Sequence, residues 1–207
     1  MDMIQTSFGK QKAWSILAGL EPDSVCQNTK ATYHEASQCY VLISFGHEIF
    51  ISPKKQKLFG NSPEAGLLLN KLQIYLELSI LWYMISAKNI ALSGELINPA
   101  SLKGGDIFER GTHILPLHEI ARKYGSNRSK FFETGKKYNA EPLNYQDASL
   151  KLYPLPRVPV VIILWETCDE FPARASLLFD SSCEHQLPVD IIWSTAMMCV
   201  LMMVSLD

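Results

Sequence analysis

One short connection between two apolar segments, residues 164–180 (LWETCDEFPARASLLFD), gathers several side chains that can do chemistry. It carries three carboxylates, a thiol and a guanidinium, on Glu166, Asp169, Glu170, Cys168 and Arg174. Carboxylates that face a cleft can bind a divalent cation or a cationic group, or act as an acid–base pair. The same composition is typical of an exposed hairpin turn, in which Arg174 pairs with Glu166 or Asp169. The Cys168 thiol acts as a nucleophile only beside a base, and no histidine is close to it in the sequence.

A second group of candidate residues lies in SLKGGDIFERGTHILPLHEIARKYG, residues 101–125. His113 lies on a loop before a predicted helix, where one ring nitrogen can ligate a metal or a cofactor metal. The alternative is a histidine that bonds the backbone or lies at the surface. His118 follows five residues later, so the two histidines do not share a helix face. Gly104 and Gly105 can bring backbone amides close to an anion, although no nucleotide-binding glycine motif is present.

The elements that must position these residues follow from hydrophobic periodicity and from helix start and stop signals. We expect helices at residues 13–20, 64–87, 116–125, 127–138 and after Pro188, and strands at 38–45, 47–52, 148–153, 158–165 and 174–179. The helix over residues 64–87 is apolar nearly all round, which is typical of a central core helix. The first two strands form a predicted hairpin with Gly46 at its corner. Prolines between the third and fourth strands predict an edge or a crossing point.

Strands that cluster without alternating with helices predict the α+β class. We expect a single domain over residues 1–207, in which antiparallel strands pack with the long central helix and a C-terminal helix. Residues 1–62 form its N-terminal part, with short helices and the hairpin.

Composition excludes several kinds of partner and site. The chain is 47% hydrophobic and 19% charged, with a formal net charge of −2, which argues against a nucleic-acid partner. No two of the five cysteines lie close enough in sequence for a local zinc or iron–sulfur motif, so no iron–sulfur cluster is expected. The odd number of cysteines and the lack of an apolar leader predict reduced thiols and a cytoplasmic protein.

The C-terminal segment, residues 191–206 (IIWSTAMMCVLMMVSL), carries no charge. It is shorter than the roughly 18–20 residues that cross a bilayer, so we expect a buried helix and no membrane span. If it were exposed, its methionines would form an apolar patch suited to a protein partner.

The segments LWYMISAKNIALSGELINPASLKGGDIF, LPLHEIARKYG, LPRVPVVIILWE and DEFPARASLLFD resemble an uncharacterised family, domain of unknown function 3786. The resemblance runs from about residue 67 to the C-terminus and is weaker before it. It implies a source among anaerobic bacteria or archaea. Some members carry an extra cysteine-rich iron–sulfur segment, which this chain lacks. Thr167 and Cys168 stand where the family's tryptophan–acid loop has a glycine.

Three hypotheses about function follow. The first is a non-catalytic binding or accessory protein of anaerobic metabolism, with an apolar pocket that takes a small molecule or a large cofactor. The resemblance suggests a corrinoid such as cobalamin, or another tetrapyrrole, with His113 as axial ligand. The second is an interaction module for a redox or methyl-transfer protein partner. The third is a small enzyme that uses the acidic connection and His113 as acid and base. The cofactor-binding residues expected for the first are Gly104, Gly105, Arg110, His113, Cys168, Asp169 and Glu170.

Overall fold

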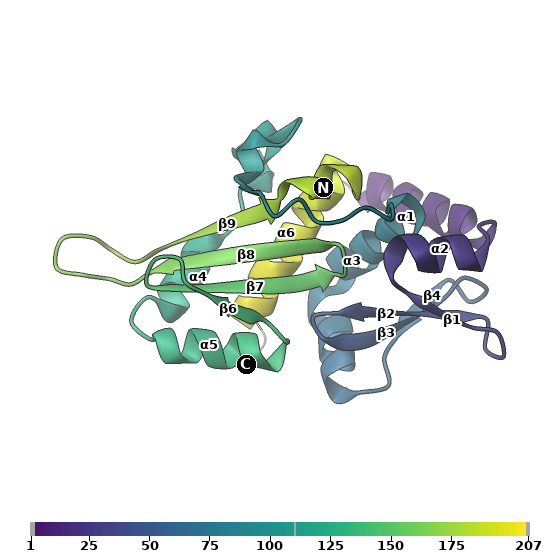
Figure 1. The fold of residues 1–207 in the computed structure, drawn as a ribbon, viewed down its shortest axis with the longest axis horizontal. Helices are drawn as coiled ribbons and strands as arrows, with labels where there is room; N and C mark the ends of the chain where they lie inside the picture. The colour runs from purple at the N-terminus through teal and green to yellow at the C-terminus, as the bar shows by residue number, and fades with distance from the viewer. Residues whose placement is uncertain (1–2, 110, 206–207) are drawn as a thin grey trace.

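The computed structural model describes residues 3–109 and 111–205 of the chain. These residues form two antiparallel sheets with six α-helices around them, which confirms the predicted α+β class (Figure 1). No helix among the described residues is long and apolar enough to cross a membrane.

The N-terminal part contains two helices and a four-stranded sheet with strand order β1-β2-β3-β4. Its elements are α1 (Met3–Ala18), α2 (Pro22–Thr29), β1 (Thr32–His34), β2 (Cys39–Ser44), β3 (His47–Ser52) and β4 (Lys57–Phe59). β2 and β3 are the predicted hairpin. Alternation along β3 buries Ile49 and Ile51, which gives the sheet one face toward the core. The short strands β1 and β4 were not predicted because three residues give little periodicity.

The second sheet has five strands in the order β5-β9-β8-β7-β6. They are β5 (Leu96–Ile97), β6 (Glu141–Leu143), β7 (Ala148–Leu155), β8 (Val158–Trp165) and β9 (Arg174–Asp180). β8 lies at the centre and is buried along nearly its whole length. Of the two alternatives predicted for the prolines between β7 and β8, an edge or a crossing point, the edge does not apply, because both strands are internal. Pro154 lies near the end of β7 and Pro156 lies in the β7–β8 turn. The register shifts between Leu152 and Leu155, so the amides that the two prolines lack fall at an irregular end of the strand pair.

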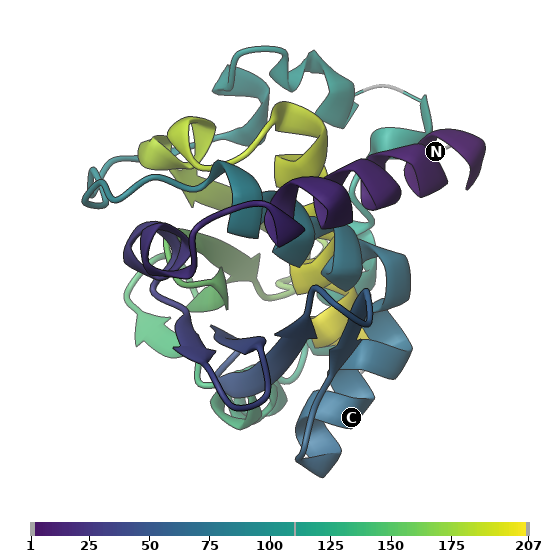
Figure 2. The same ribbon diagram turned by 90° about the vertical axis from the view of Figure 1, so that its right-hand side faces the viewer.

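Helices cover the sheets and bring distant parts of the chain together. They are α3 (Pro63–Ser86), α4 (Leu117–Tyr124), α5 (Arg128–Lys137) and α6 (Val189–Ser205), with 3-10 turns η1 (Pro99–Ser101), η2 (Gly105–Glu109), η3 (Gly111–His113) and η4 (Ser181–His185). α3 and α6 pack against each other, and α1 packs on α3 (Figures 1 and 2). α3 is the predicted core helix, but its backbone departs from helical geometry at Gln73 (φ 43°).

α6 is the centre of the core. Its methionines Met198, Met202 and Met203 are fully buried, and Met197 is nearly so, as expected for a terminal helix enclosed by other elements. The apolar patch considered for this segment is therefore not on the surface.

The two sheets are joined by direct hydrogen bonds from the β2–β3 turn to the end of β7. The backbone amide of Phe45 donates to the Tyr153 carbonyl at 2.9 Å, and the Ser44 hydroxyl donates to the Pro154 carbonyl at 2.8 Å. Gly46 has φ +80°, and a Cβ there would lie 2.5 Å from the Asn139 Cβ. Glycine is thus required at this corner both by the turn and by the close contact.

Arg157, in the β7–β8 turn, joins three segments of the chain. Its guanidinium donates to the Asn28 carbonyl at 2.7 Å, the Gln27 carbonyl at 3.2 Å, the Ile90 carbonyl at 3.0 Å and the Asn89 Oδ1 at 2.5 Å. The residue is only 8% exposed. The five N–H donors of the planar guanidinium match this set of acceptors, and a single ammonium cannot reproduce that arrangement of donors.

We therefore expect Arg157→Lys to lower the free energy of unfolding by about 2 kcal/mol, because buried carbonyls lose donors while the charge is kept. Urea unfolding checks this: the midpoint concentration of urea should fall, while the dependence of the free energy of unfolding on urea concentration stays the same. Arg128→Lys is the matched control, since exposed Arg128 makes one long bond to the Asp147 carbonyl. It should change stability by no more than about 0.5 kcal/mol. Equal midpoints for the wild type and Arg157→Lys would contradict the role given to the guanidinium fork.

Candidate ligand-binding groove

A groove of about 710 Å³ lies where η4 enters α6, opposite the loop of residues 102–104. We call it the α6 groove. Its floor includes the buried side chains of Leu187 and Ile192, and its rim carries Lys103, Glu184 and His185. A mostly apolar surface with a few polar groups at its edge, in this range of volume, is typical of small-molecule sites.

Of the two glycines predicted from the sequence, Gly104 lines the groove and Gly105 supports the turn behind it. Gly104 has φ +79° and lies against Val189, whose Cγ1 would be 3.6 Å from an added Cβ. Gly105 packs so closely on the turn of η1 that an added Cβ would lie 2.2 Å from the Pro99 carbonyl oxygen. Gly104 lines the α6 groove, whereas Gly105 lies behind it as a structural residue.

The rim of the groove carries charges of both signs, on Lys103 and on Glu184. The backbone amide of Lys103 donates to Glu184 Oε1 at 2.6 Å, which holds that carboxylate in place. In the first turn of α6 the amides of Ile191 and Ile192 donate to the Pro188 carbonyl, which leaves the amides of Val189 and Asp190 at the positive end of the helix dipole. Asp190, in the same turn, is exposed and opposes that charge. The rim therefore offers Lys103 and helix amides to an anionic group and the His185 ring nitrogens to a metal or a donor.

η4 is held in place by a buried carboxylate, Asp180, which is 4% exposed. Oδ1 accepts from the Ser182 amide and hydroxyl and from the Ser93 amide and hydroxyl, and Oδ2 accepts from the Gly94 amide at 2.8 Å. Burial alone would raise the pKa of Asp180, but these hydrogen bonds outweigh it and lower the pKa to about 2.

His113 is the last residue of η3 and packs against Trp193 of α6, one helical turn beyond the groove-lining residue Val189. Its ring packs edge-on against Trp193 with centroids 4.8 Å apart, and its carbonyl accepts from Trp193 Nε1 at 2.5 Å. Trp193 follows Val189 by four residues, so both side chains lie on one face of α6. The structure therefore brings His113 and Gly104 to neighbouring positions, although His113 is not a lining residue of the groove. Arg110 lies outside the described residues.

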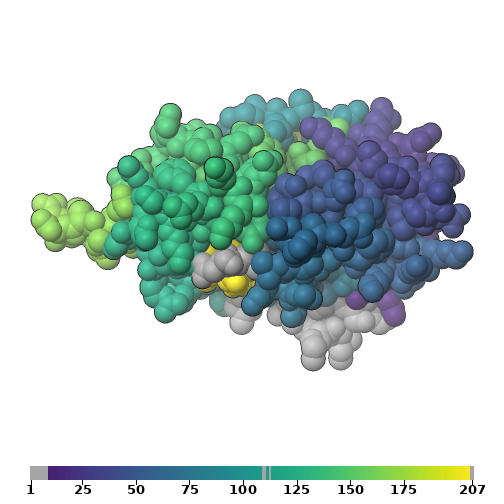
Figure 3. Space-filling view, turned by 90° about the horizontal axis from the view of Figure 1, so that it is seen from below, coloured from purple at the N-terminus to yellow at the C-terminus, as the bar shows by residue number. Residues whose placement is uncertain are grey.

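The acidic connection is the turn of the β8–β9 hairpin, which projects from the body of the molecule (Figures 1 and 3). Cys168, Asp169 and Glu170 are exposed. The Thr167 amide donates to the Gly125 carbonyl at 2.9 Å, which fixes the turn at the C-terminal end of α4. His113 precedes the other end of α4, a helix that spans roughly 12 Å. The structure does not bring the acidic connection and His113 together.

Arg174 does not form the pairs expected across this hairpin. Its guanidinium lies over the Trp165 ring, 4.1 Å from the centroid. A cation over an indole face at the surface is worth about 0.5–1 kcal/mol. The carboxylates of Glu166, Asp169 and Glu170 are consequently left without this arginine as a partner.

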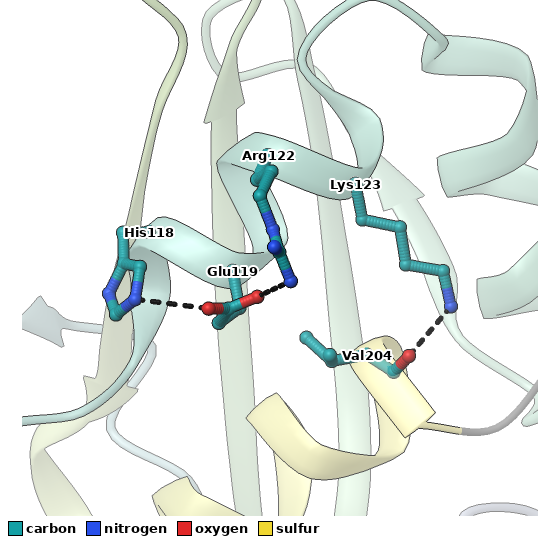
Figure 4. Close-up of polar contacts among 5 residues, drawn as sticks. All are labelled: His118, Glu119, Arg122, Lys123 and Val204. Atoms are coloured by element: carbon teal, nitrogen blue, oxygen red, sulfur yellow. Dashed lines mark hydrogen bonds and ion pairs between the residues drawn. The ribbon is translucent and has the colours of Figure 1, made fainter.

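His118 belongs to a separate surface cluster on α4 (Figure 4). Its Nε2 lies 3.2 Å from Glu119 Oε1, and Arg122 also pairs with Glu119. Lys123 extends the other way and donates to the Val204 carbonyl at 2.9 Å, at the end of α6. The first cluster is exposed and contributes little to stability, whereas Lys123 caps the negative end of the buried helix.

Lys103, Glu184 and His185 were not singled out from the sequence as one site. Their positions are about 80 residues apart, and the only local signal was Pro188 as a helix start. Among residues 3–109 and 111–205, no group of three or more His, Cys, Asp or Glu is arranged to hold a metal ion. Burial raises the pKa of Cys183, the thiol within η4, to about 12.

The model of the family described as a domain of unknown function (DUF3786) matches residues 21–202. The chain belongs to this family. The match covers the α6 groove, the β8–β9 hairpin and Arg157, so these features lie within the family domain. No curated protein and no solved structure matches the chain.

Replacing the carboxylate that holds η4 should lower stability in a pH-dependent way. The pKa of folded Asp180 is below the ordinary 3.8, so its stabilisation is full above about pH 5 and is lost as the pH falls through about 2. We expect Asp180→Asn to lower the free energy of unfolding by about 2 kcal/mol at pH 7, with a smaller difference at pH 3.

Urea unfolding at several pH values between 3 and 7 measures this difference. Asp169→Asn, in the exposed hairpin turn, is the control and should match the wild type at each pH. A wild-type advantage over Asp180→Asn that stays constant down to pH 3 would contradict the prediction.

Proposed function

We propose that this protein is a non-catalytic binding protein that takes its ligand in the α6 groove. The observation that carries the proposal is the combination of an apolar floor, Leu187 and Ile192, with polar groups confined to one rim. Such a site favours a ligand with a largely apolar body and a charged end. The floor residues Leu187 and Ile192 are buried, and their segments are held in place by the hydrogen bonds of Asp180 and by the packing of α6. The groove is therefore largely formed before a ligand arrives.

The ligand class follows from the rim. Lys103 and the amides at the start of α6 favour a carboxylate or phosphate, and His185 offers a nitrogen donor. A corrinoid or another tetrapyrrole combines a broad apolar face, anionic or polar side groups and a metal that takes an imidazole. We therefore propose a tetrapyrrole as the ligand to test first, with His185 as the axial donor and His113 as the alternative.

An acid–base reaction between His113 and the acidic connection is not favoured, because these groups lie at opposite ends of α4. General acid–base catalysis needs the two groups within hydrogen-bond reach of one substrate. The binding function uses neither Asp169 nor Glu170.

Absorption spectra of the protein with hemin and with cobalamin, after removal of unbound compound, test the proposal. We expect a retained and shifted band that is lost in Val189→Trp, because the indole fills the groove. His185→Ala should shift the band further or weaken binding by about tenfold or more, as expected for loss of a metal ligand.

His34→Ala, in the exposed strand β1, is the matched control and should leave the spectrum unchanged. If His113→Ala alone changes the spectrum, the axial donor is His113 and not His185. A retained band that Val189→Trp does not affect would place the compound outside the α6 groove and would contradict the proposal.

The exposed tip of the β8–β9 hairpin favours a second function, docking on a protein partner. Phe171 is 67% exposed at this tip, beside Asp169 and Glu170. The tip is stiffened by a hydrogen bond from the Cys168 amide to the Phe171 carbonyl at 3.0 Å. An aromatic residue flanked by carboxylates on a projecting turn suits a partner with an apolar pocket and a basic rim.

A photo-crosslinking amino acid at position 171 tests this docking function in cells of the source organism. We expect one discrete protein adduct, reduced several-fold when Asp169→Asn and Glu170→Gln are added, because the basic rim then loses its complement. The same crosslinker at exposed Tyr145 is the control and should not give that adduct. Identical adducts from positions 145 and 171 would show capture without specific docking.

A further inference from the structure

A second pocket, of about 480 Å³, lies in the N-terminal part of the chain and shares no lining residue with the α6 groove. It is enclosed by the α1–α2 connection, by β1 and β2, and by the β3–β4 turn. We call it the tyrosine pocket. Its polar side chains include Glu21, Tyr33, Tyr40 and Lys54, and its apolar walls include Leu17 and Leu20.

The hydroxyl of Tyr40 distinguishes this pocket. Tyr40, Tyr83 and Tyr124 are among the largest fully buried side chains of the protein. The Tyr83 hydroxyl donates to the Thr29 carbonyl at 3.0 Å, and the Tyr124 hydroxyl donates to the Met203 carbonyl. The Tyr40 residue is only 2% exposed and lines the pocket, yet its hydroxyl bonds to none of the described residues. Its oxygen is not among the fully buried side-chain atoms that lack a partner, so it reaches the open space of the pocket, where a ligand group can accept its hydrogen bond.

The protonation state of Tyr40 fits a donor role. Burial, with smaller contributions from Cys26, Tyr33 and Glu21, raises the pKa of Tyr40 to about 12. The hydroxyl therefore keeps its proton at neutral pH and can donate to an anionic acceptor. The Tyr33 ring lies 4.8 Å from the Tyr40 ring at 53°, which gives the pocket an aromatic wall.

Two groups of opposite charge lie at the mouth of the pocket. Lys54, in the β3–β4 turn, is exposed and provides an ammonium. Glu21 precedes α2 at the N-cap position, but its side chain makes no capping hydrogen bond, so its carboxylate is available to a ligand. A ligand that carries a single charge would pair with one of these two groups and would be repelled by the other, which has the same sign as the ligand.

We propose that the tyrosine pocket binds a free amino acid with an apolar or aromatic side chain. The carboxylate accepts hydrogen bonds from Tyr40 and Lys54, the ammonium faces Glu21, and the side chain lies against Leu17, Leu20 and Tyr33. Charge-assisted hydrogen bonds of this kind are the strong ones in binding sites, and aromatic and aliphatic walls favour apolar side chains. This binding is independent of the function proposed for the α6 groove.

Isothermal titration calorimetry with L-phenylalanine and L-leucine tests the proposal on the full chain. We expect saturable 1:1 binding of at least one of them. 3-Phenylpropionate, which lacks the ammonium, and phenethylamine, which lacks the carboxylate, should each bind at least about tenfold more weakly. No heat with either amino acid, or equal affinity for 3-phenylpropionate, would overturn the proposal.

Matched variants separate recognition from folding. Tyr40→Phe and Lys54→Met should each weaken binding by about tenfold or more, and Glu21→Gln should remove the preference over 3-phenylpropionate. Two variants are the controls: Tyr153→Phe, in the other sheet, and Lys55→Met, next to Lys54. Both should bind the amino acids with the affinity of the wild type. Tyr40→Phe loses no protein hydrogen bond, so its thermal unfolding should match the wild type. Wild-type affinity in both Tyr40→Phe and Lys54→Met would overturn the assignment of this pocket.

Discussion

The guanidinium of Arg157 is a buried cation whose neighbours are carbonyl oxygens, from the end of α2 and from the segment that follows α3. Burying a charge without compensation is costly, but a delocalised guanidinium with a full set of acceptors is the cation that tolerates it best. The last carbonyls of α2 also carry the negative end of that helix dipole. Arg157 therefore holds the N-terminal part against the five-stranded sheet, together with the hydrogen bonds that Ser44 and Phe45 donate to the end of β7.

Asp180 follows the same principle with the opposite charge. Its carboxylate is surrounded by amides and hydroxyls, just as Arg157 is surrounded by carbonyls. Both groups hold the irregular segment after α3: Arg157 binds it at Asn89 and Ile90, and Asp180 binds it at Ser93 and Gly94. Charges that are satisfied by backbone dipoles fix the course of a loop more closely than surface ion pairs do, because several peptide groups must keep one orientation. This segment thus needs little regular secondary structure of its own.

Sequence periodicity predicted the central helix α3 and the long strands, because a buried stripe repeats over several turns or pleats, whereas only the end of α1 was expected as a helix. The central helix and the β8 strand are examples, and the buried terminal helix follows from its lack of charge. The two-residue strand β5 and the break at Gln73 leave no such signal. Of the residues that line the α6 groove, only Gly104 was singled out from the sequence. Gly104 was singled out together with its neighbour Gly105. His185 lines the groove with Lys103 only because η4 lies against the loop of residues 102–104, a contact that no local pattern encodes.

The two proposed sites are connected through the hydrogen bonds that hold the fold. α2 begins at the tyrosine pocket and ends at Arg157, which also binds the loop after α3. Lys88, in that loop, exchanges backbone hydrogen bonds with the buried side chain of Gln186, which directly follows His185. Spatial continuity of this kind carries a signal only if an element along it has two arrangements of similar energy. Each group on this path instead has its partners satisfied in one arrangement, so the network fixes both sites relative to the core and favours two pre-formed, independent binding sites.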